Sequence, residues 1–364
     1  MKISKLSVGS ISVPLHHPFR TALRTVTSVD DLVVRLETDD GLIGYGEAAP
    51  TPVITGDTRG GILEGFSIAG RAIMGLRLDE PETIFNRLAG SMVHNTSAKA
   101  ALHMAIWDLI ARSYGQPLNA VLGGARRWLE CDLTISLNDP EQMAADSRAA
   151  VAQGFGILKV KIGTDAQLDL ERLKAVRAAV GSGVRLRLDA NQGWKPDEAI
   201  RVMHKIEDAG VDPDLVEQPV KANDLEGLAR VTAAVDTPVL ADEAIFSPLD
   251  AERVITSHAA DMINIKLMKT GGIWQALKIV ALAEINQVEV MMGSMMESAV
   301  SVTAAAQLAM ARSCFTMIDL DPPMLCSANP VRGGMAWQGS RITLPEAPGL
   351  GIDGIDGVGF QELR

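Results

Sequence analysis

The sequence of 364 residues predicts an α/β protein, in which a (β/α)8-type barrel follows a smaller α+β unit. Two observations predict the barrel. Short apolar runs recur from about residue 130 onward, and a stretch with helical periodicity lies in most of the gaps between them. A third observation, the mixture of strand and helix signals before residue 130, predicts that the N-terminal part is a unit of its own.

The N-terminal unit begins with predicted strands. Residues 2–13 and 31–46 alternate between apolar and polar positions and are rich in β-branched residues, and Asp39-Asp40-Gly41 is typical of a hairpin turn. Residues 97–112 then carry apolar side chains at helical spacing, with Ser97 as the expected N-cap. We therefore expect an α+β unit here.

Eight strands are expected in the second part of the chain. Their starts lie 23 to 30 residues apart, which is the length that a strand, a helix and two loops need. The strands are expected at residues 133–137, 158–162, 185–188, 215–218, 239–242, 262–265, 289–292 and 315–318. Helices are expected between them, for example over 168–180 and 197–209. A doubly wound open sheet is the alternative, and the lack of a GxGxxG motif after the first strand counts against it.

Composition and charge argue against several classes of function. Hydrophobic residues make up 47% and charged residues 22%, as in a globular protein with a large core. The formal net charge of −11 argues against a nucleic-acid partner, because phosphate binding needs clustered Lys and Arg. We see no signal peptide and no apolar run of about 18 residues, so no membrane partner is expected. Three isolated cysteines, Cys131, Cys314 and Cys326, favour a reducing cytoplasm.

Polar residues end most of the expected barrel strands. In a parallel barrel, the C-terminal ends of the strands meet at one face, and that face carries the active site. Each residue alone has an ordinary explanation, such as a turn, a helix cap or a solvated strand edge, but their expected convergence indicates a site. The residues are Lys159, Lys161, Asp189, Asn191, Glu217, Asp242, Glu243, Asn264, Lys266, Ser294, Glu297, Asp319 and Asp321.

Three of these carboxylates indicate a metal ion. Asp189, Glu217 and Asp242 end three consecutive strands and would repel one another unless a cation joined them. An all-oxygen set that leaves positions open for substrate suits Mg²⁺. The six histidines form no HExxH motif, so zinc has little support.

Two lysines, Lys161 and Lys266, lie on strands to either side of the carboxylates. Facing each other across a cation, they suit removal of a carbon-bound proton on one side and its return on the other. Mg²⁺ at the substrate carboxylate would offset the charge of the enediolate. A lysine base must be neutral, and nearby cations lower a lysine pKa. We expect Lys159 and the metal to do this for Lys161, and Lys269 to contribute near Lys266.

The segments LKVKIG, RLDANQGW, LVEQP, LADE and INIKLMKTGG resemble those of the enolase superfamily, in its muconate-lactonizing-enzyme-like subgroup. The resemblance covers nearly the whole chain. It implies a modified TIM barrel, (β/α)7β, over residues 126–325, an α+β capping domain over 1–125, and a segment 326–364 that packs back on the cap. It also implies a homo-oligomer, a dimer or an octamer. For the site it implies one Mg²⁺ per subunit on Asp189, Glu217 and Asp242, with Lys161 and Lys266 as acid/base residues.

Further segments are similar to those of dipeptide epimerases. Asp319-Leu320-Asp321 resembles the DxD motif that holds the substrate's α-ammonium group. FRTALRTV and PTPVITGDT resemble the two capping-domain loops of L-Ala-D/L-Glu epimerases, which implies that Arg24 meets the glutamate side-chain carboxylate. Leu320, where an aromatic residue is common, and the following Pro322-Pro323 depart from that pattern and leave the pocket's shape open.

Four other substrate contacts are implied by the resemblance. GSMMESAVSVTAAA is similar to the seventh-strand segment of the same group, which implies Ser294 and Met296. Thr134 and Lys159 complete the set, with Lys159 at the substrate carboxylate.

The expected function is that of a Mg²⁺-dependent dipeptide epimerase, an isomerase that inverts the α-carbon of the C-terminal residue, with L-Ala-D/L-Glu from murein peptide as the leading substrate. The alternatives are N-succinylamino-acid racemase, o-succinylbenzoate synthase and muconate cycloisomerase. Their substrates present no free ammonium group to Asp319 and Asp321. A non-catalytic metal-binding barrel is another alternative, and the joint presence of two lysines and three acids counts against it.

Overall fold

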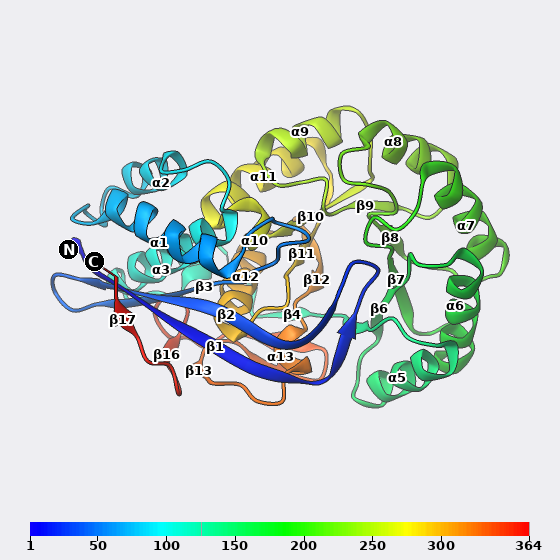
Figure 1. Ribbon diagram of the computed structural model, residues 1–364, viewed down its shortest axis with the longest axis horizontal. Helices are drawn as coiled ribbons and strands as arrows, with labels where there is room; N and C mark the ends of the chain where they lie inside the picture. The colour runs from blue at the N-terminus through cyan, green and yellow to red at the C-terminus, as the bar shows by residue number, and fades with distance from the viewer. Residues whose placement is uncertain (125, 364) are drawn as a thin grey trace.

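The computed structural model of the chain describes residues 1–124 and 126–363. Figure 1 shows an N-terminal part, with an antiparallel sheet and helices, beside a sheet of parallel strands ringed by helices. The boundary predicted between residues 125 and 126 includes a residue outside the described ones, and so does the end of the predicted segment 326–364.

The alternating N-terminal residues form three antiparallel strands. β1 (Ile3–Arg20) pairs with β2 (Thr25–Thr38), and β2 pairs with β3 (Ile43–Ala48). The turn between β2 and β3 falls at Asp39-Asp40-Gly41, as the sequence predicted. Most apolar positions of the three strands are buried, and Phe19, Val26 and Ile43 are partly buried, so the hydrophobic pattern indicates which face of the sheet packs inward.

Three helices follow the sheet, and the third packs on β3. They are α1 (Arg59–Ile73), α2 (Pro81–Gly90) and α3 (Thr96–Ser113). Gly46 permits the close approach of β3 to α3, because a Cβ there would lie 1.9 Å from Ala101 O. The prediction that Ser97 is the N-cap is wrong. The N-cap is Asn95, and the Ser97 amide donates a hydrogen bond to Asp57 Oδ2 (2.9 Å), so a carboxylate from a neighbouring loop caps the helix.

Eight parallel strands form one sheet in which every strand lies beside its neighbours in the chain. They are β5 (Leu133–Ile135), β6 (Ile157–Lys161), β7 (Arg185–Asp189), β8 (Leu215–Glu217), β9 (Val239–Ala241), β10 (Met262–Lys266), β11 (Glu289–Gly293) and β12 (Phe315–Asp319). All eight lie within two residues of the predicted bounds. The Asp132 amide, just before β5, donates to Ile318 O on β12 (3.1 Å), which brings the first and last strands together. This consecutive order confirms the barrel and excludes the doubly wound sheet.

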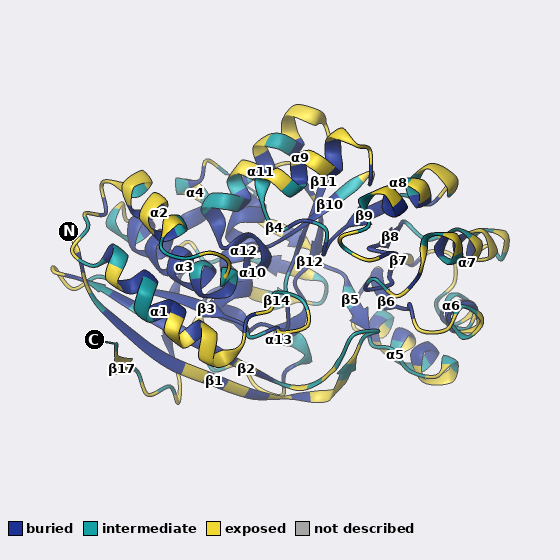
Figure 2. Cartoon of the chain, turned by 45° about the horizontal axis from the view of Figure 1, so that its top comes forward, coloured by how far each residue is buried: buried dark blue, intermediate teal, exposed yellow. Residues whose placement is uncertain are grey.

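Helices connect successive strands, and most of them bury an inner face against the sheet and expose an outer face (Figure 2). They are α5 (Pro140–Ala152), α6 (Ala166–Val180), α7 (Pro196–Asp208), α8 (Leu225–Ala234), α9 (Pro248–Thr256), α10 (Leu267–Thr270), α11 (Ile273–Asn286) and α12 (Ala299–Ala311). The connection between β10 and β11 holds both α10 and α11, so the arrangement is (β/α)7β. α12 is buried along its whole length, unlike the amphipathic α7, because it also contacts β3 and α3.

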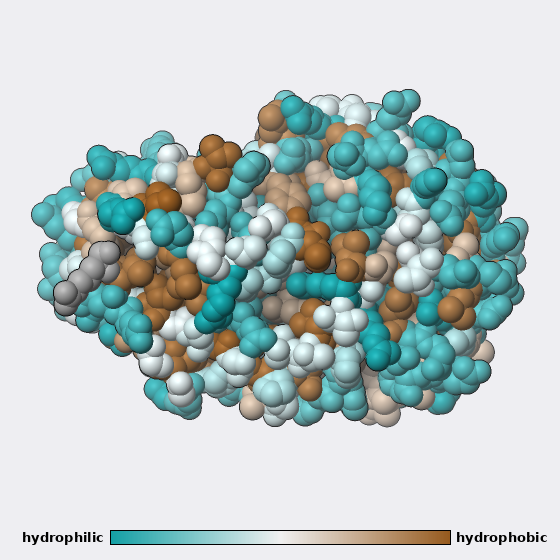
Figure 3. Space-filling view, viewed as in Figure 1, coloured by the Kyte–Doolittle hydropathy of each residue, from teal (hydrophilic) through white to brown (hydrophobic). Residues whose placement is uncertain are grey.

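Short elements complete the chain. They are α4 (Leu118–Val121), β4 (Trp128–Glu130), α13 (Pro322–Leu325), β13 (Val331–Gly333), β14 (Ala336–Gln338), β15 (Arg341–Thr343), β16 (Ile352–Ile355) and β17 (Gln361–Glu362). β17 pairs with β1, so the C-terminal segment reaches the N-terminal sheet (Figure 1). The face in Figure 3 is mostly hydrophilic, with small apolar groups scattered over it. None of the helices that the structure describes is long and apolar enough to span a membrane.

Candidate active site

Strand register places the predicted charged residues at one level of the barrel. Lys161 on β6 lies beside Asp189 on β7, and Asp189 lies beside Glu217 on β8. On the other side, Lys266 on β10 pairs with Gly293 on β11, and Gly293 pairs with Asp319 on β12. All of these side chains are therefore at the C-terminal ends of their strands.

The two predicted acid/base lysines each contact a different carboxylate. Lys161 Nζ lies 2.5 Å from Asp189 Oδ2, and Lys266 Nζ lies 2.7 Å from Asp242 Oδ2. Because the sheet order is β6-β7-β8-β9-β10, the lysines are on strands to either side of the carboxylates. Both lysines are buried.

Lys159 lies at the centre of the charged cluster. Its Nζ is 2.6 Å from Asp319 Oδ2, 2.8 Å from Glu217 Oε2 and 3.1 Å from Asp189 Oδ2. Burial acts to lower the pKa of Lys159, but these carboxylates raise it well above its ordinary value. The side chain is a fixed cation among anions from three strands.

A neighbouring cation acts on the pKa of Lys266, but nearby carboxylates outweigh it in this structure. Burial and Lys159 act to lower that pKa, but Asp242 and Glu217 hold it above the ordinary value. Lys269 differs, because burial lowers its pKa although Asp242 Oδ1 lies 2.6 Å from its Nζ. Lys266 is therefore an ammonium group.

The three carboxylates predicted as metal ligands have divergent pKa values. Burial and then Asp189 raise the pKa of Glu217 to about 8. Burial also acts to raise the pKa of Asp189, but the lysines, Lys161 first, lower it to about 2. Burial likewise opposes ionisation of Asp242, and Lys266 and Lys269 lower its pKa far below the usual range. Mutual repulsion of buried carboxylates thus leaves one of the three holding a proton near neutral pH.

The same three carboxylates fit a hard divalent cation. Among the described residues, no three His, Cys, Asp or Glu side chains surround a single point as metal ligands do. The carboxylates instead contact lysines, yet two of their buried oxygens, Glu217 Oε2 and Asp242 Oδ1, accept no hydrogen bond of good geometry. Each of these two oxygens instead faces a lysine, Lys159 at 2.8 Å and Lys269 at 2.6 Å. An all-carboxylate set that already attracts cations is the donor chemistry that Mg²⁺ prefers.

Asp319 and Asp321 lie at the end of β12 beside the lysines. Asp319 contacts Lys159, and burial opposes its ionisation, but Lys159 and Lys266 lower its pKa. Asp321 Oδ2 accepts a hydrogen bond from the Thr134 amide (2.7 Å), which links β5 to β12. Burial and then Asp319 raise the pKa of Asp321 to about 6.

The β1–β2 hairpin reaches from the N-terminal part to the barrel rim (Figure 1). The Arg20 amide donates to Ser136 Oγ (2.7 Å), and the Leu137 amide donates to Arg20 O (3.0 Å). Arg24 lies in the turn of this hairpin and is partly buried. Burial lowers the pKa of Arg24, and Asp31 on β2 offsets part of that effect.

The remaining predicted contacts, Ser294 and Met296, follow β11. Met296 is buried and Ser294 is partly exposed. Gly293 just before them has a steric role, because a Cβ there would lie 3.0 Å from Cε of Lys266.

Asn264, which was predicted at a strand end, donates to Glu217 Oε1 (3.0 Å) and so orients that carboxylate. Phe19 was not predicted from the sequence, and it places its ring 5.8 Å from Lys161 Nζ. The sequence signal for Phe19 is an aromatic residue followed by a basic one, Arg20, at the end of β1. Such a pair is too common in sequences to indicate a site.

A buried acidic cluster, made of Asp31, Glu47 and Glu297, joins the N-terminal sheet to the barrel. Glu47 on β3 accepts hydrogen bonds from the Ser298 amide (2.7 Å), the Ser298 hydroxyl (2.8 Å) and the Ser301 amide (2.8 Å). It therefore caps α12 from another part of the fold, where the helix dipole favours an anion. Burial, then Glu47, raise the pKa of Asp31 well above its usual range.

This arrangement, a barrel with carboxylates at consecutive strand ends and a lysine to either side, defines a class of proteins that move protons beside a bound carboxylate. Residues 4–123 match the family described as mandelate racemase / muconate lactonizing enzyme, N-terminal domain, and residues 142–356 match the enolase C-terminal domain-like family. The chain belongs to the mandelate racemase / muconate lactonizing enzyme family of the enolase superfamily.

Similar proteins of this family include epimerases. The L-Ala-D/L-Glu epimerase of Clostridium acetobutylicum is 51% identical over 98% of this chain and 100% of its own length. The substrate-liganded structure of the L-Ala-D/L-Glu epimerase from Bacillus subtilis has a TM-score of 0.96 at 46% identity, covering 98% of this chain and 99% of that one. The dipeptide epimerase of Enterococcus faecalis, complexed with Mg and L-Leu-L-Tyr, has a TM-score of 0.94 at 41% identity, covering 97% and 99%.

The buried acidic cluster predicts a pH-dependent stability. Burial, then Glu47, raise the pKa of Glu297 to about 7 from its ordinary 4.5, although Ser301 and Met295 donate hydrogen bonds to it. A raised carboxyl pKa means that the folded state binds the extra proton, so its contribution to stability is lost as the pH rises from 4.5 to 7. Glu297→Gln removes this loss. The free energy of unfolding of the variant, relative to wild type, should rise by up to about 3 kcal/mol across that range.

Urea unfolding at a series of pH values measures the difference, and Glu64→Gln at an exposed position of α1 is the control. A difference for Glu297→Gln that stays constant with pH would contradict the assignment.

Proposed function

We propose that the chain is a Mg²⁺-dependent dipeptide epimerase that inverts the α-carbon of the C-terminal residue, with L-Ala-D/L-Glu as the leading substrate. The observation that carries this proposal is the placement of Lys161 and Lys266 to either side of the three carboxylates, each 2.7 Å or less from one of them. Two nitrogen bases on opposite sides can reach opposite faces of one α-carbon. That arrangement is what inversion requires.

The proton transfers follow from this placement. One lysine, as the neutral amine, takes the α-proton from one face, and the other, as the ammonium, gives a proton to the opposite face. Lys161 is on β6 and Lys266 is on β10, so Lys161 is the base and Lys266 the donor for the epimer whose α-proton faces β6. Inversion in the other direction exchanges the two roles. Lys159, as a fixed cation at the centre, is placed to meet the substrate carboxylate.

Asp189, Glu217 and Asp242 are the residues that would hold the Mg²⁺, one per subunit. When bound there, the ion would supply positive charge against the charge that develops on the substrate carboxylate. Structures of similar dipeptide epimerases, such as the Cytophaga hutchinsonii protein with D-Ala-L-Val, contain Mg, which supports this assignment. Asn264 would keep Glu217 oriented.

Residues around the lysines would select the dipeptide. Asp319 and Asp321 would bind the α-ammonium group, because two carboxylates next to each other on one strand end attract a cation. Arg24, on the hairpin turn, would bind a glutamate side chain. Thr134, Ser294 and Met296 would line the rest of the pocket.

The other enzyme activities are less well supported. N-succinylamino-acid racemisation, o-succinylbenzoate synthesis and muconate cycloisomerisation use substrates without the free ammonium that Asp319 and Asp321 would bind. A non-catalytic metal-binding barrel would not need lysines on both sides. The proposal also includes the predicted domain boundaries, a homo-oligomer and a cytoplasmic location, for which the three free thiols give support.

The two-base arrangement predicts complementary isotope exchange in variants. In ²H₂O with Mg²⁺, wild type should introduce deuterium at the α-carbon of L-Ala-L-Glu as the epimer appears. Lys161→Ala and Lys266→Ala should each lower epimerisation by about 10³-fold or more. Each variant should still exchange the α-proton of one epimer, and the two variants should differ in which one.

Mass spectrometry and NMR read out the exchange, and Lys174→Ala on the exposed side of α6 is the control. Near-normal epimerisation by either active-site variant, or no α-deuterium in any dipeptide tried, would show that the proposed function is wrong.

Mg²⁺ should stabilise the protein as well as activate it. At about 100 times its Kd, Mg²⁺ should raise the free energy of unfolding by about 2.7 kcal/mol. Glu217→Gln keeps the shape of a ligand but not its charge, so this variant should lose most of the thermal shift. EDTA should abolish α-proton exchange, and added Mg²⁺ should restore it. Equal thermal shifts in wild type and Glu217→Gln would count against the ligand set.

Arg24 should control selectivity for an acidic C-terminal residue. A charge-assisted hydrogen bond contributes about 1.5–3 kcal/mol, so Arg24→Gln should lower kcat/KM for L-Ala-L-Glu by about 10- to 100-fold. The value for L-Ala-L-Leu should change little. Arg20→Gln, an exposed arginine on the same hairpin, is the matched control. Equal losses on both dipeptides would remove the glutamate assignment.

A further inference from the structure

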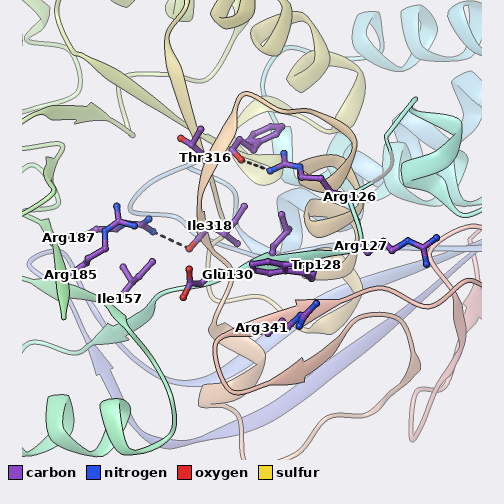
Figure 4. Close-up of a pocket in the computed structure, with 12 residues that line it drawn as sticks. Arg126, Arg127, Trp128, Glu130, Ile157, Arg185, Arg187, Thr316, Ile318 and Arg341 are labelled. Carbon is purple, nitrogen blue, oxygen red and sulfur yellow. Dashed lines mark hydrogen bonds between the residues drawn. The ribbon is translucent and has the colours of Figure 1, made fainter. Parts of the chain in front are cut away.

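A cavity of about 700 Å³ opens at the N-terminal end of the barrel, on the opposite side from the candidate active site. It lies between the starts of β6, β7 and β12 and the small sheet of β4 and β15 (Figure 4). β7 separates the two sites, with Arg185 at its start and Asp189 at its end. Four residue steps at about 3.3 Å each put their Cα atoms about 13 Å apart.

Five arginines line this cavity, which we call the arginine cavity, and they come from distant parts of the chain. They are Arg126, Arg127, Arg185, Arg187 and Arg341. Glu130 is the single acidic residue that lines it. Three of the five pair with carboxylates, Arg127 with Glu346 (3.7 Å), Arg185 with Asp214 (2.7 Å) and Arg187 with Asp132 (2.7 Å), whereas Arg126 and Arg341 have no ion pair among the described residues. In a chain of net charge −11, five guanidinium groups around one concave site are a local concentration of cations.

The deepest arginine lacks a full set of acceptors. Arg187 is 1% exposed, and its Nη1 donates to Asp132 Oδ2 (2.7 Å) and Ile318 O (3.4 Å). Its Nε donates to no atom of the described residues. A buried guanidinium N–H without an acceptor costs free energy, so an anion at the inner end of the cavity would be favoured.

The outer arginines are accessible and fixed in position. Arg341 stacks its guanidinium over the Trp128 ring at 4.6 Å and has no ion pair among the residues that the structure describes. Arg185 is exposed and pairs with Asp214 (2.7 Å). Arg126 has a structural role, because it donates hydrogen bonds to Ala309 O (2.6 Å) and Phe315 O (3.0 Å).

We propose that the arginine cavity binds a small polyanion that carries two or more phosphate or carboxylate groups. Guanidinium forks match both groups bidentately, and several arginines around one space favour a ligand with more than one such group. The volume lies within the range of small-molecule sites. The site is independent of the proposed epimerase activity, since it shares no residue with the candidate active site.

Isothermal titration calorimetry on the full chain with excess Mg²⁺ tests this. The probes are fructose 1,6-bisphosphate for the phosphate class and tricarballylate for the carboxylate class. The key variant is Arg185→Gln/Arg341→Gln, which changes exposed side chains and leaves the buried Arg187–Asp132 pair intact. Arg230→Gln is the matched control, because Arg230 is as exposed as Arg185 (55% and 56%) and is also paired with an aspartate. Circular dichroism verifies that each variant is folded.

Saturable binding of one molecule per chain is expected for at least one probe, with the Kd raised about 10- to 100-fold in the double variant and unchanged in Arg230→Gln. Arg341→Lys, which keeps the charge and loses the fork, should give a smaller increase. Binding of one probe alone identifies the phosphate or the carboxylate class. Absence of saturable binding of both probes at millimolar concentration, or a Kd equally affected in the control, would overturn the proposal.

Discussion

Repulsion between buried carboxylates is the constraint on which the rest of the site depends. Asp189 and Glu217 lie beside each other in register at the ends of neighbouring strands, and Asp242 directly follows the next strand, β9. In this structure, Lys161 contacts Asp189, Lys266 contacts Asp242, and Lys159 contacts Glu217, whose pKa burial and Asp189 raise to about 8. Basic and acidic groups are therefore packed together at one face of the barrel, and both the affinity for a cation and the protonation of the lysines depend on their balance.

The N-terminal part is fixed to this face at two places. Glu47 caps α12 through three hydrogen bonds, and the hairpin of β1 and β2 binds the segment after β5 through the Arg20 backbone. Gly46, which lets β3 lie against α3, makes the first attachment possible. The position of Phe19 near Lys161 is thus set by backbone contacts and not by the flexible side chains of the turn.

Much of the fold and the centre of the site could be predicted from the sequence. The eight strands were found because each is a short apolar run at a regular interval, and Lys161, Asp189 and Lys266 follow from the rule that strand ends converge. The N-cap of α3 was missed because Asp57, which caps the helix, comes from outside the local pattern. The raised pKa of Lys266 was not predicted, because it depends on the 2.7 Å contact with Asp242, a distance that strand order alone does not set. The arginine cavity could not be predicted from the sequence, because its arginines are up to 215 residues apart, from Arg126 to Arg341. The negative net charge of the chain also gave no indication of an anion-binding site.

The hairpin turn has an evolutionary consequence. Arg24 precedes Lys159, the first lysine of the barrel strands, by more than a hundred residues. The hairpin turn and the barrel strands are therefore separate elements of the fold. Under the proposed function, substitutions in the turn would alter which side chain is accepted while the lysines stay unchanged. One relative, 51% identical to this chain, is named for a dipeptide with an acidic residue, and another, 41% identical, is named for hydrophobic dipeptides. Such a difference between relatives is expected if the turn and the barrel change independently.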